Sequence, residues 1–165
     1  MITARLANLI RRNKKEVMFT TFWIAIVSAV VIISYYSIYL TSVWGYWKTA
    51  FSVSPWEGPS IDIIGITVLV IVGIVAGYVI DDSRSLIFAC SFTIIISFSI
   101  AVAFSFCYIW FVLNYQPTGV VPYAWEWYLY MAVVIIFRMF IPTALFTCLF
   151  GAALGSIIRV YILGK

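Results

Sequence analysis

Long apolar stretches dominate this sequence and constrain its fold more than any other feature. Four of them cover approximately residues 17–40, 63–80, 85–113 and 127–158. A helix needs roughly 20 apolar residues to cross the hydrocarbon core of a bilayer, which is about 30 Å thick. Because lipid offers no hydrogen-bond partner to a bare backbone, a stretch that spans the bilayer must be helical. The sequence therefore predicts an all-α, polytopic membrane protein with a bundle of four transmembrane helices.

The overall composition excludes a water-soluble globule. Of the 165 residues, 65% are hydrophobic and 10% are charged, whereas a soluble domain is about 45–50% apolar and about 25% charged. The sequence has no histidine, which excludes histidine-ligated haem, copper or zinc and any nucleophile that a histidine activates. We therefore expect no cofactor and no nucleic-acid partner, and an enzyme is the less favoured class of protein.

Basic residues are distributed unevenly between the segments that connect the expected helices. The links 41–62 and 114–126 contain Lys48 as their one basic residue. Cytoplasmic segments carry the excess of Lys and Arg in membrane proteins. The side opposite to these two links is therefore expected to face the cytoplasm. Both termini are expected on that side, and the chain is expected in the cell membrane. The basic residues on that side are Arg5, Arg11, Arg12, Lys14, Lys15, Arg84, Arg159 and Lys165.

The first 16 residues combine basic side chains with an apolar stripe. Ile2, Leu6, Leu9 and Ile10 recur at helical spacing, which is typical of an amphipathic helix at a membrane surface. Such a helix attaches to anionic lipid or to a cytoplasmic partner; alternatively, residues 1–16 are a basic tail that only sets the topology. We expect a cytoplasmic segment of residues 1–16 and a transmembrane domain of residues 17–163.

The second and fourth expected spans share a pattern of small residues. Gly73 and Gly77 lie near the cytoplasmic end of one, and Gly151 and Gly155 lie at a matching depth in the other. Both spans run from the outside to the inside, so they are parallel. Small residues four apart let parallel helices approach closely within lipid. The sequence therefore predicts that these two helices pack glycine against glycine.

Each of these two spans also carries one ionisable residue, roughly 30 Å from its cytoplasmic boundary at 1.5 Å per residue. These residues are Asp62 and Arg138. An arginine within a span costs at least ~2.5–3.5 kcal/mol and normally has a partner, which predicts an intramembrane ion pair. Alternatively, Arg138 snorkels to the outer headgroups and the preceding segment lies at the interface. Pro142 removes a backbone hydrogen bond and predicts a kink in the fourth span.

Aromatic residues gather at the end opposite to the basic one. Trp and Tyr are favoured at headgroup depth, where a ring with a polar edge is satisfied. The one-sided excess also suits a partner or an apolar ligand that docks from outside. The expected outer aromatic collar consists of Trp44, Trp47, Trp56, Trp125 and Trp127.

The sequence lacks the residue patterns for two common chemistries, thiol–disulfide exchange and catalysis by a pair of aspartates. The three cysteines, Cys90, Cys107 and Cys148, lie within spans and form no C-x-x-C pair, so they are expected to be buried apolar thiols. Asp81 and Asp82 are adjacent and point about 100° apart on a helix, which does not suit a catalytic pair; we expect them to form a turn.

The favoured function is a non-catalytic integral membrane subunit that packs in, and stabilises or positions, a larger membrane assembly or a homo-oligomer. Its expected partners are the lipid bilayer and other membrane subunits or further copies of itself. The alternative is a small oligomeric transporter or channel with Asp62 and Arg138 near the permeation path. Ser91, Ser99 and Ser105 in the third span suit such a path, but hydroxyls that bond back to their own helix carbonyls explain them equally well.

Overall fold

The computed structural model describes residues 2–40, 61–80, 82–112 and 125–164, and nearly all of them are helical. The prediction of an all-α protein is confirmed for this part of the chain. Helices that follow one another without a break combine into four rods. The elements are α1 (Ile2–Leu40), α3 (Ile63–Val79), α4 (Ser83–Cys107), the π-helix η1 (Tyr108–Val112), α5 (Trp125–Met139), the π-helix η2 (Phe140–Leu145) and α6 (Phe146–Leu163).

Three of the rods are long and apolar enough to cross a membrane. The qualifying stretches are Lys14–Ser37, Ser83–Phe111 and Tyr128–Ile162. The remaining apolar helix, α3, has 17 residues and is about 26 Å long at 1.5 Å per residue, slightly less than the hydrocarbon core of a bilayer. Length and composition are therefore those of a helical membrane bundle.

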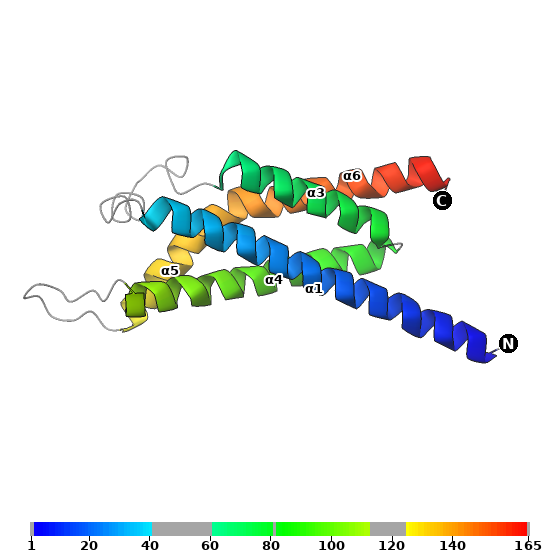
Figure 1. Ribbon diagram of the computed structural model, residues 1–165, viewed down its shortest axis with the longest axis horizontal. Coiled ribbons are helices and arrows are strands. Elements are labelled where there is room, and N and C mark those ends of the chain that lie inside the picture. The colour runs from blue at the N-terminus through cyan, green and yellow to red at the C-terminus, as the bar shows by residue number, and fades with distance from the viewer. Residues whose placement is uncertain (1, 41–60, 81, 113–124, 165) are drawn as a thin grey trace, which may run out of the picture.

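Residues 2–40 form one uninterrupted helix. α1 runs through both the basic residues 2–16 and the apolar stretch that follows. Neither Gly nor Pro occurs between Ile2 and Leu40, so nothing in the sequence stops the helix at the boundary. The first turns of α1 project past the end of α3 (Figure 1).

The rods form two pairs that α1 joins. The most extensive contact is between α3 and α6, and the next is between α1 and α4; α1 also contacts α3, and α4 contacts α5. α3 and α6 lie side by side and run in the same direction (Figure 1). The start of α1, the end of α6, the end of α3 and the start of α4 lie at one end of the molecule (Figure 1). We call it the basic end, because Lys14, Lys15, Arg84 and Arg159 lie in these segments.

Short polar side chains and a glycine fix the helix ends. The Asp62 carboxylate accepts a hydrogen bond from the Gly65 N–H at 2.9 Å and caps α3. Asp82 caps the start of α4, where its carboxylate accepts from the Arg84 N–H at 3.3 Å. α6 ends at Gly164, whose left-handed backbone (φ 62°) suits a residue without a side chain.

The fourth rod changes direction around Pro142. A π-helix, η2, separates α5 from α6, and α5 lies obliquely to α6 (Figure 1). Proline has no N–H to donate and clashes with the carbonyl four residues earlier, and the wider turn of a π-helix accommodates both effects. The kink that Pro142 predicts is present.

The core lies mainly between α1, α4 and the kinked fourth rod. Phe98 of α4 packs edge-on against Phe140 of η2, with ring centroids 5.7 Å apart. Trp23 and Tyr35 of α1 are fully buried. By contrast, bulky apolar side chains cover much of the outer surface, including Ile63 on α3, which is 82% exposed. This distribution suits a protein whose outer surface meets lipid rather than water.

Candidate functional site

The two helices with paired glycines, α3 and α6, meet along those glycines. All four, Gly73, Gly77, Gly151 and Gly155, are buried. A Cβ added to Gly73 would lie 3.0 Å from the Gly151 Cα, and one added to Gly151 would lie 2.6 Å from the Val70 carbonyl oxygen. The structure thus brings the four glycines together in one interface, where the backbones of the two helices touch.

Gly77 and Gly155, the two glycines nearer the basic end, leave even less space in this interface. A Cβ on Gly77 would overlap the carbonyl oxygen of Ala152, and a Cβ on Gly155 would overlap that of Ile74. Backbone atoms cannot move aside as a flexible side chain can. Because both positions exclude any side chain, the helices are closest toward the basic end.

Arg159 continues this interface by one turn of α6 beyond Gly155. Its side chain is only 8% exposed, and its Nη1 donates a hydrogen bond to the carbonyl oxygen of Ile80. Ile80 caps the C-terminus of α3, where unpaired carbonyls and the helix dipole attract a cation. A buried guanidinium therefore ties the end of α3 to α6.

Asp62 directly precedes α3, at the end of that helix away from the basic end, and Arg138 lies just before the bend in the fourth rod. Asp62 is exposed and uses its carboxylate to cap α3. Arg138 lies in the last turn of α5 and is half-buried. Among the described residues no ion pair joins these two side chains, so their intramembrane pairing stays a prediction. The local capping bond accounts for the position of the Asp62 carboxylate.

The second helix pair, α1 and α4, is closed by small and hydroxylated residues. The Ser97 hydroxyl donates to the carbonyl oxygen of Ile24 across the pair, at 3.2 Å. Thr93, Ala101 and Ser105 share this face of α4 at four-residue spacing and are fully buried. Small side chains at this spacing permit close helix packing in membranes, which makes α1–α4 a second tight contact.

The serines named from the sequence divide between two environments. Ser105 is buried, whereas Ser91 and Ser99 are exposed. The Ser99 hydroxyl donates to the carbonyl of Ile95 in its own helix at 2.9 Å. Ser91, Ser99 and Ser105 therefore form no single stripe, and the buried row on α4 consists of Thr93, Ser97 and Ser105.

Only part of the expected aromatic collar lies in the described segments. Trp125, at the start of α5, is 54% exposed, and Trp127 lies in the same helix. Trp44, Trp47 and Trp56 lie outside the described residues. Trp110 packs edge-on against Tyr128, with ring centroids 5.3 Å apart, so aromatic contacts do join η1 to α5 at the end opposite to the basic one.

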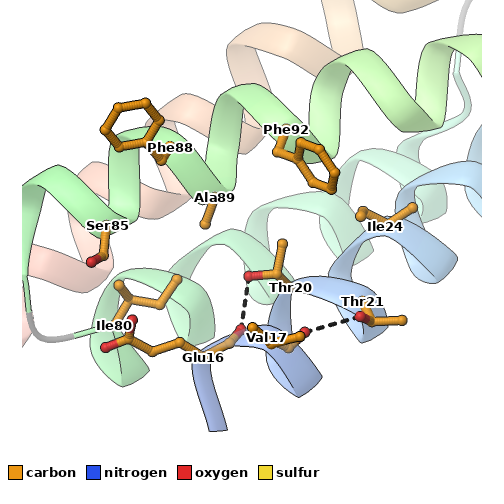
Figure 2. A pocket seen from close by; sticks show the side chains of 10 residues that line it. All are labelled: Glu16, Val17, Thr20, Thr21, Ile24, Ile80, Ser85, Phe88, Ala89 and Phe92. Carbon is orange, nitrogen blue, oxygen red and sulfur yellow. Dashed lines mark hydrogen bonds between the residues drawn. The ribbon is translucent and has the colours of Figure 1, made fainter. Parts of the chain in front are cut away.

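An open groove of about 390 Å³ lies between α1 and α4 at the basic end. Figure 2 shows Phe88 and Phe92 of α4 on one side and the α1 residues on the other. Ile80, whose carbonyl binds Arg159, also lines the groove. We call this the basic-end groove. Its full lining is Glu16, Val17, Thr20, Thr21, Ile24, Ile80, Ser85, Phe88, Ala89 and Phe92.

The hydroxyl groups in the basic-end groove already have partners within their own helices. Thr20 donates to the Glu16 carbonyl at 2.8 Å, and Thr21 donates to the Val17 carbonyl at 2.9 Å (Figure 2). Ser85 lies within 3.4 Å of the Asp82 carboxylate. Because these bonds are local, methyl and phenyl groups dominate the surface that an occupant would meet. The one carboxylate in the lining, that of Glu16, lies beside Ile80 in Figure 2.

Sequence reasoning missed the role of Arg159 and the groove. Arg159 was predicted only to mark the cytoplasmic boundary. Its spacing held a further signal, because Gly151, Gly155 and Arg159 recur every four residues and so share one helix face. The groove depends on how α1 and α4 diverge, for which the sequence has no local signal.

The described segments do not contain three or more His, Cys, Asp or Glu residues grouped closely enough to hold a metal ion. Comparison of the chain with protein-family models, with curated proteins and with solved structures gave no match. The function must therefore be argued from the chain's own packing and surface.

Proposed function

We propose that the chain is a non-catalytic integral membrane subunit, and that it stabilises or positions a larger membrane assembly or a homo-oligomer. In this proposal it lies in the cell membrane with both termini in the cytoplasm. The basic end then meets the cytoplasmic headgroups, where Lys14, Lys15 and Arg84 are exposed. The positive-inside rule supports this orientation.

The proposal depends mainly on one observation: the chain's paired glycines and small residues pack its own helices tightly against one another. The glycines of α3 and α6 bring two backbones into contact, and the small residues of α4 pack against α1. Such packing makes a stiff scaffold. The outward faces carry bulky apolar side chains, so a scaffold of this kind offers surface rather than chemistry.

The outer face of α4 supports association with another helix. Ser99, Ala103 and Cys107 are exposed and recur at four-residue spacing. Exposed small residues at this spacing permit a second helix to approach closely. Phe111 continues this four-residue row and Phe104 lies beside it; both are exposed and would contact such a helix.

Assembly is tested in native-lipid nanodiscs, which are prepared without a detergent step that could dissociate an oligomer into monomers. The subunit count is measured by photobleaching of a single label per chain, and co-purifying proteins are quantified. We expect two or more chains per disc, or a stoichiometric partner. Ala103→Trp should lower this count or release the partner, whereas Ala153→Trp, at an exposed position of α6, should not. A strictly monomeric chain without a partner would contradict the proposal.

Orientation needs a separate measurement. Reporters that are active only in the cytoplasm, fused to either end of the chain, should both be active. A reporter placed at Lys48 should be inactive. Activity at Lys48, or silence at either end, would contradict the proposed topology.

A small oligomeric transporter or channel is the second candidate. The charged residues Asp62 and Arg138 favour it, since ionisable groups in spans often line substrate or ion pathways. In this alternative they lie near the permeation path. Flux into liposomes tests it: if Asp62→Asn leaves a measured flux unchanged, Asp62 does not serve permeation.

A further inference from the structure

We propose that the basic-end groove binds one acyl chain of an anionic phospholipid, whose phosphate group lies against Lys14 and Arg84. This inference depends on the proposed membrane location. It adds a specific ligand site to a surface that the proposed function leaves undefined.

The shape of the groove suits a lipid chain. On α1 the lining extends from Glu16 to Ile24, which is about 12 Å along the helix axis. A volume of about 390 Å³ lies in the range of small-ligand sites, roughly 300–1,000 Å³. A helix about 10 Å across with its side chains would fill roughly 900 Å³ over the same length, more than twice the volume of the groove, whereas a single extended acyl chain is much thinner.

The chemistry of the walls also suits a lipid chain. Val17 is 65% exposed, Phe88 is 76% exposed and Phe92 is 56% exposed, so three apolar side chains face outward around the groove. The hydroxyls of Thr20 and Thr21 are occupied by backbone carbonyls. The groove is open to its surroundings, and in a membrane the apolar molecule available to fill it is lipid.

The charges beside the groove select the headgroup. Lys14 lies three residues before Val17, at the edge of the α1 face that lines the groove, and Arg84 directly precedes Ser85 on α4. Lys15 lies on the opposite face of α1, because a helix has 3.6 residues per turn. Lys14 and Arg84 are exposed, and they lie in the segments at the basic end of the groove, where a phosphate would emerge. Basic sites between helices on the cytoplasmic side bind anionic headgroups. Two acids lie nearby. Asp82 uses its carboxylate to cap α4, and Glu16 is part of the lining but lies at the opposite edge of the α1 face from Lys14.

Native mass spectrometry of the purified full chain tests the proposal. The protein is titrated with phosphatidylglycerol or with phosphatidylcholine of identical acyl chains. We expect one phosphatidylglycerol to bind more tightly than phosphatidylcholine. Replacing Lys14 and Arg84 together by Gln should weaken phosphatidylglycerol binding by roughly fivefold per cation and leave phosphatidylcholine unchanged.

A variant that fills the groove tests the acyl-chain site itself. Ala89 lies between the two phenyl groups of the lining, so Ala89→Trp should reduce the binding of both lipids. Ala153→Trp places the same side chain on the exposed surface of α6 and should bind as the wild type does. Circular dichroism and thermal unfolding of both variants report whether each has folded.

The outcomes separate this inference from the proposed function. Equal affinity for the two lipids, a preference for phosphatidylcholine, or unchanged binding by a folded Ala89→Trp variant would overturn the lipid site. If the wild-type chain is released from membranes by alkaline carbonate, the membrane location itself fails. A chain that stays in the membrane but lacks the lipid preference refutes the groove proposal alone.

Discussion

The Arg159 guanidinium donates a hydrogen bond to the carbonyl oxygen of Ile80, the residue that follows α3. Both residues are buried, Ile80 completely and Arg159 to all but 8% of its surface. The bond joins the end of α3 to α6 just beyond the last glycine of their interface. It also places a cation at the negative end of the α3 dipole.

Arg159→Gln should destabilise the protein by about 1.5–3 kcal/mol, the usual contribution of a hydrogen bond to a charged group. The loss arises because the Ile80 carbonyl stays buried without its charged donor. The free energy of unfolding in mixed micelles, measured by SDS titration, checks the value.

Arg84→Gln is the matched control for that substitution. Arg84 lies at the same end of the molecule but is exposed, and exposed charges contribute little to stability. Both substitutions remove one cation from the basic end, so any effect on topology should be shared. Equal destabilisation by the two would show that charge at this end, rather than the bond to Ile80, is what matters.

Gly77→Val and Gly155→Val should each destabilise the fold by about 1–3 kcal/mol or more, because overpacking against backbone atoms forces the helices apart. In both cases the new Cβ overlaps a carbonyl oxygen of the partner helix. SDS unfolding again measures the effect, with Ala153→Val as the exposed control on α6. A tolerated Gly77→Val would mean that α3 and α6 are not in backbone contact.

The sequence indicated the α3–α6 pairing because that pairing depends on residue type at a fixed spacing. Glycines four apart, at matching depth in two parallel helices, leave few other ways for those helices to approach closely. The kink at Pro142 was predictable for a similar reason, since the missing N–H is a property of the residue itself.

The hydrogen-bond partner of a particular side chain was not predictable in the same way. Asp62 has two possible partners, a distant guanidinium or the N–H groups of its own helix, and the second requires no long-range geometry. In the structure its carboxylate meets the Gly65 N–H. For Asp82, likewise, the sequence predicted a turn, and its role as the cap of α4 depends on where that helix begins.

Ser97→Ala should cost about 0.6 kcal/mol, the average for a hydrogen bond between membrane helices, because it removes the bond from α4 to the Ile24 carbonyl of α1. Ser99→Ala is the matched control, since that hydroxyl bonds within its own helix and should contribute close to nothing. The difference between the two free energies of unfolding tests the prediction. A larger loss of stability for Ser99→Ala than for Ser97→Ala would contradict the prediction, because the stabilising hydroxyl would then lie on the outer face of α4.

Pro142→Ala should straighten the fourth rod. Alanine restores a backbone N–H and removes the ring that clashes with the preceding turn. Both effects of proline that favour the π-helix η2 are then absent. Spin labels at Tyr130 and Ile157, both exposed, report the relative direction of α5 and α6 once the native cysteines are replaced. We expect the distance between the labels to lengthen in the variant. An unchanged distance would attribute the bend to the packing of α5 on α4.

Substitutions of Asp62 separate helix capping from ion pairing. A cap that is lost by Asp62→Ala costs about 0.5–2 kcal/mol, whereas asparagine caps a helix as well as aspartate does. If capping is the role of Asp62, Asp62→Asn should therefore unfold at the same SDS fraction as the wild type. An ion pair with Arg138 predicts the opposite, because asparagine carries no charge. The double variant Asp62→Arg with Arg138→Asp completes the test: stability above that of either single variant supports the pair, and stability no better than theirs leaves capping as the role of Asp62.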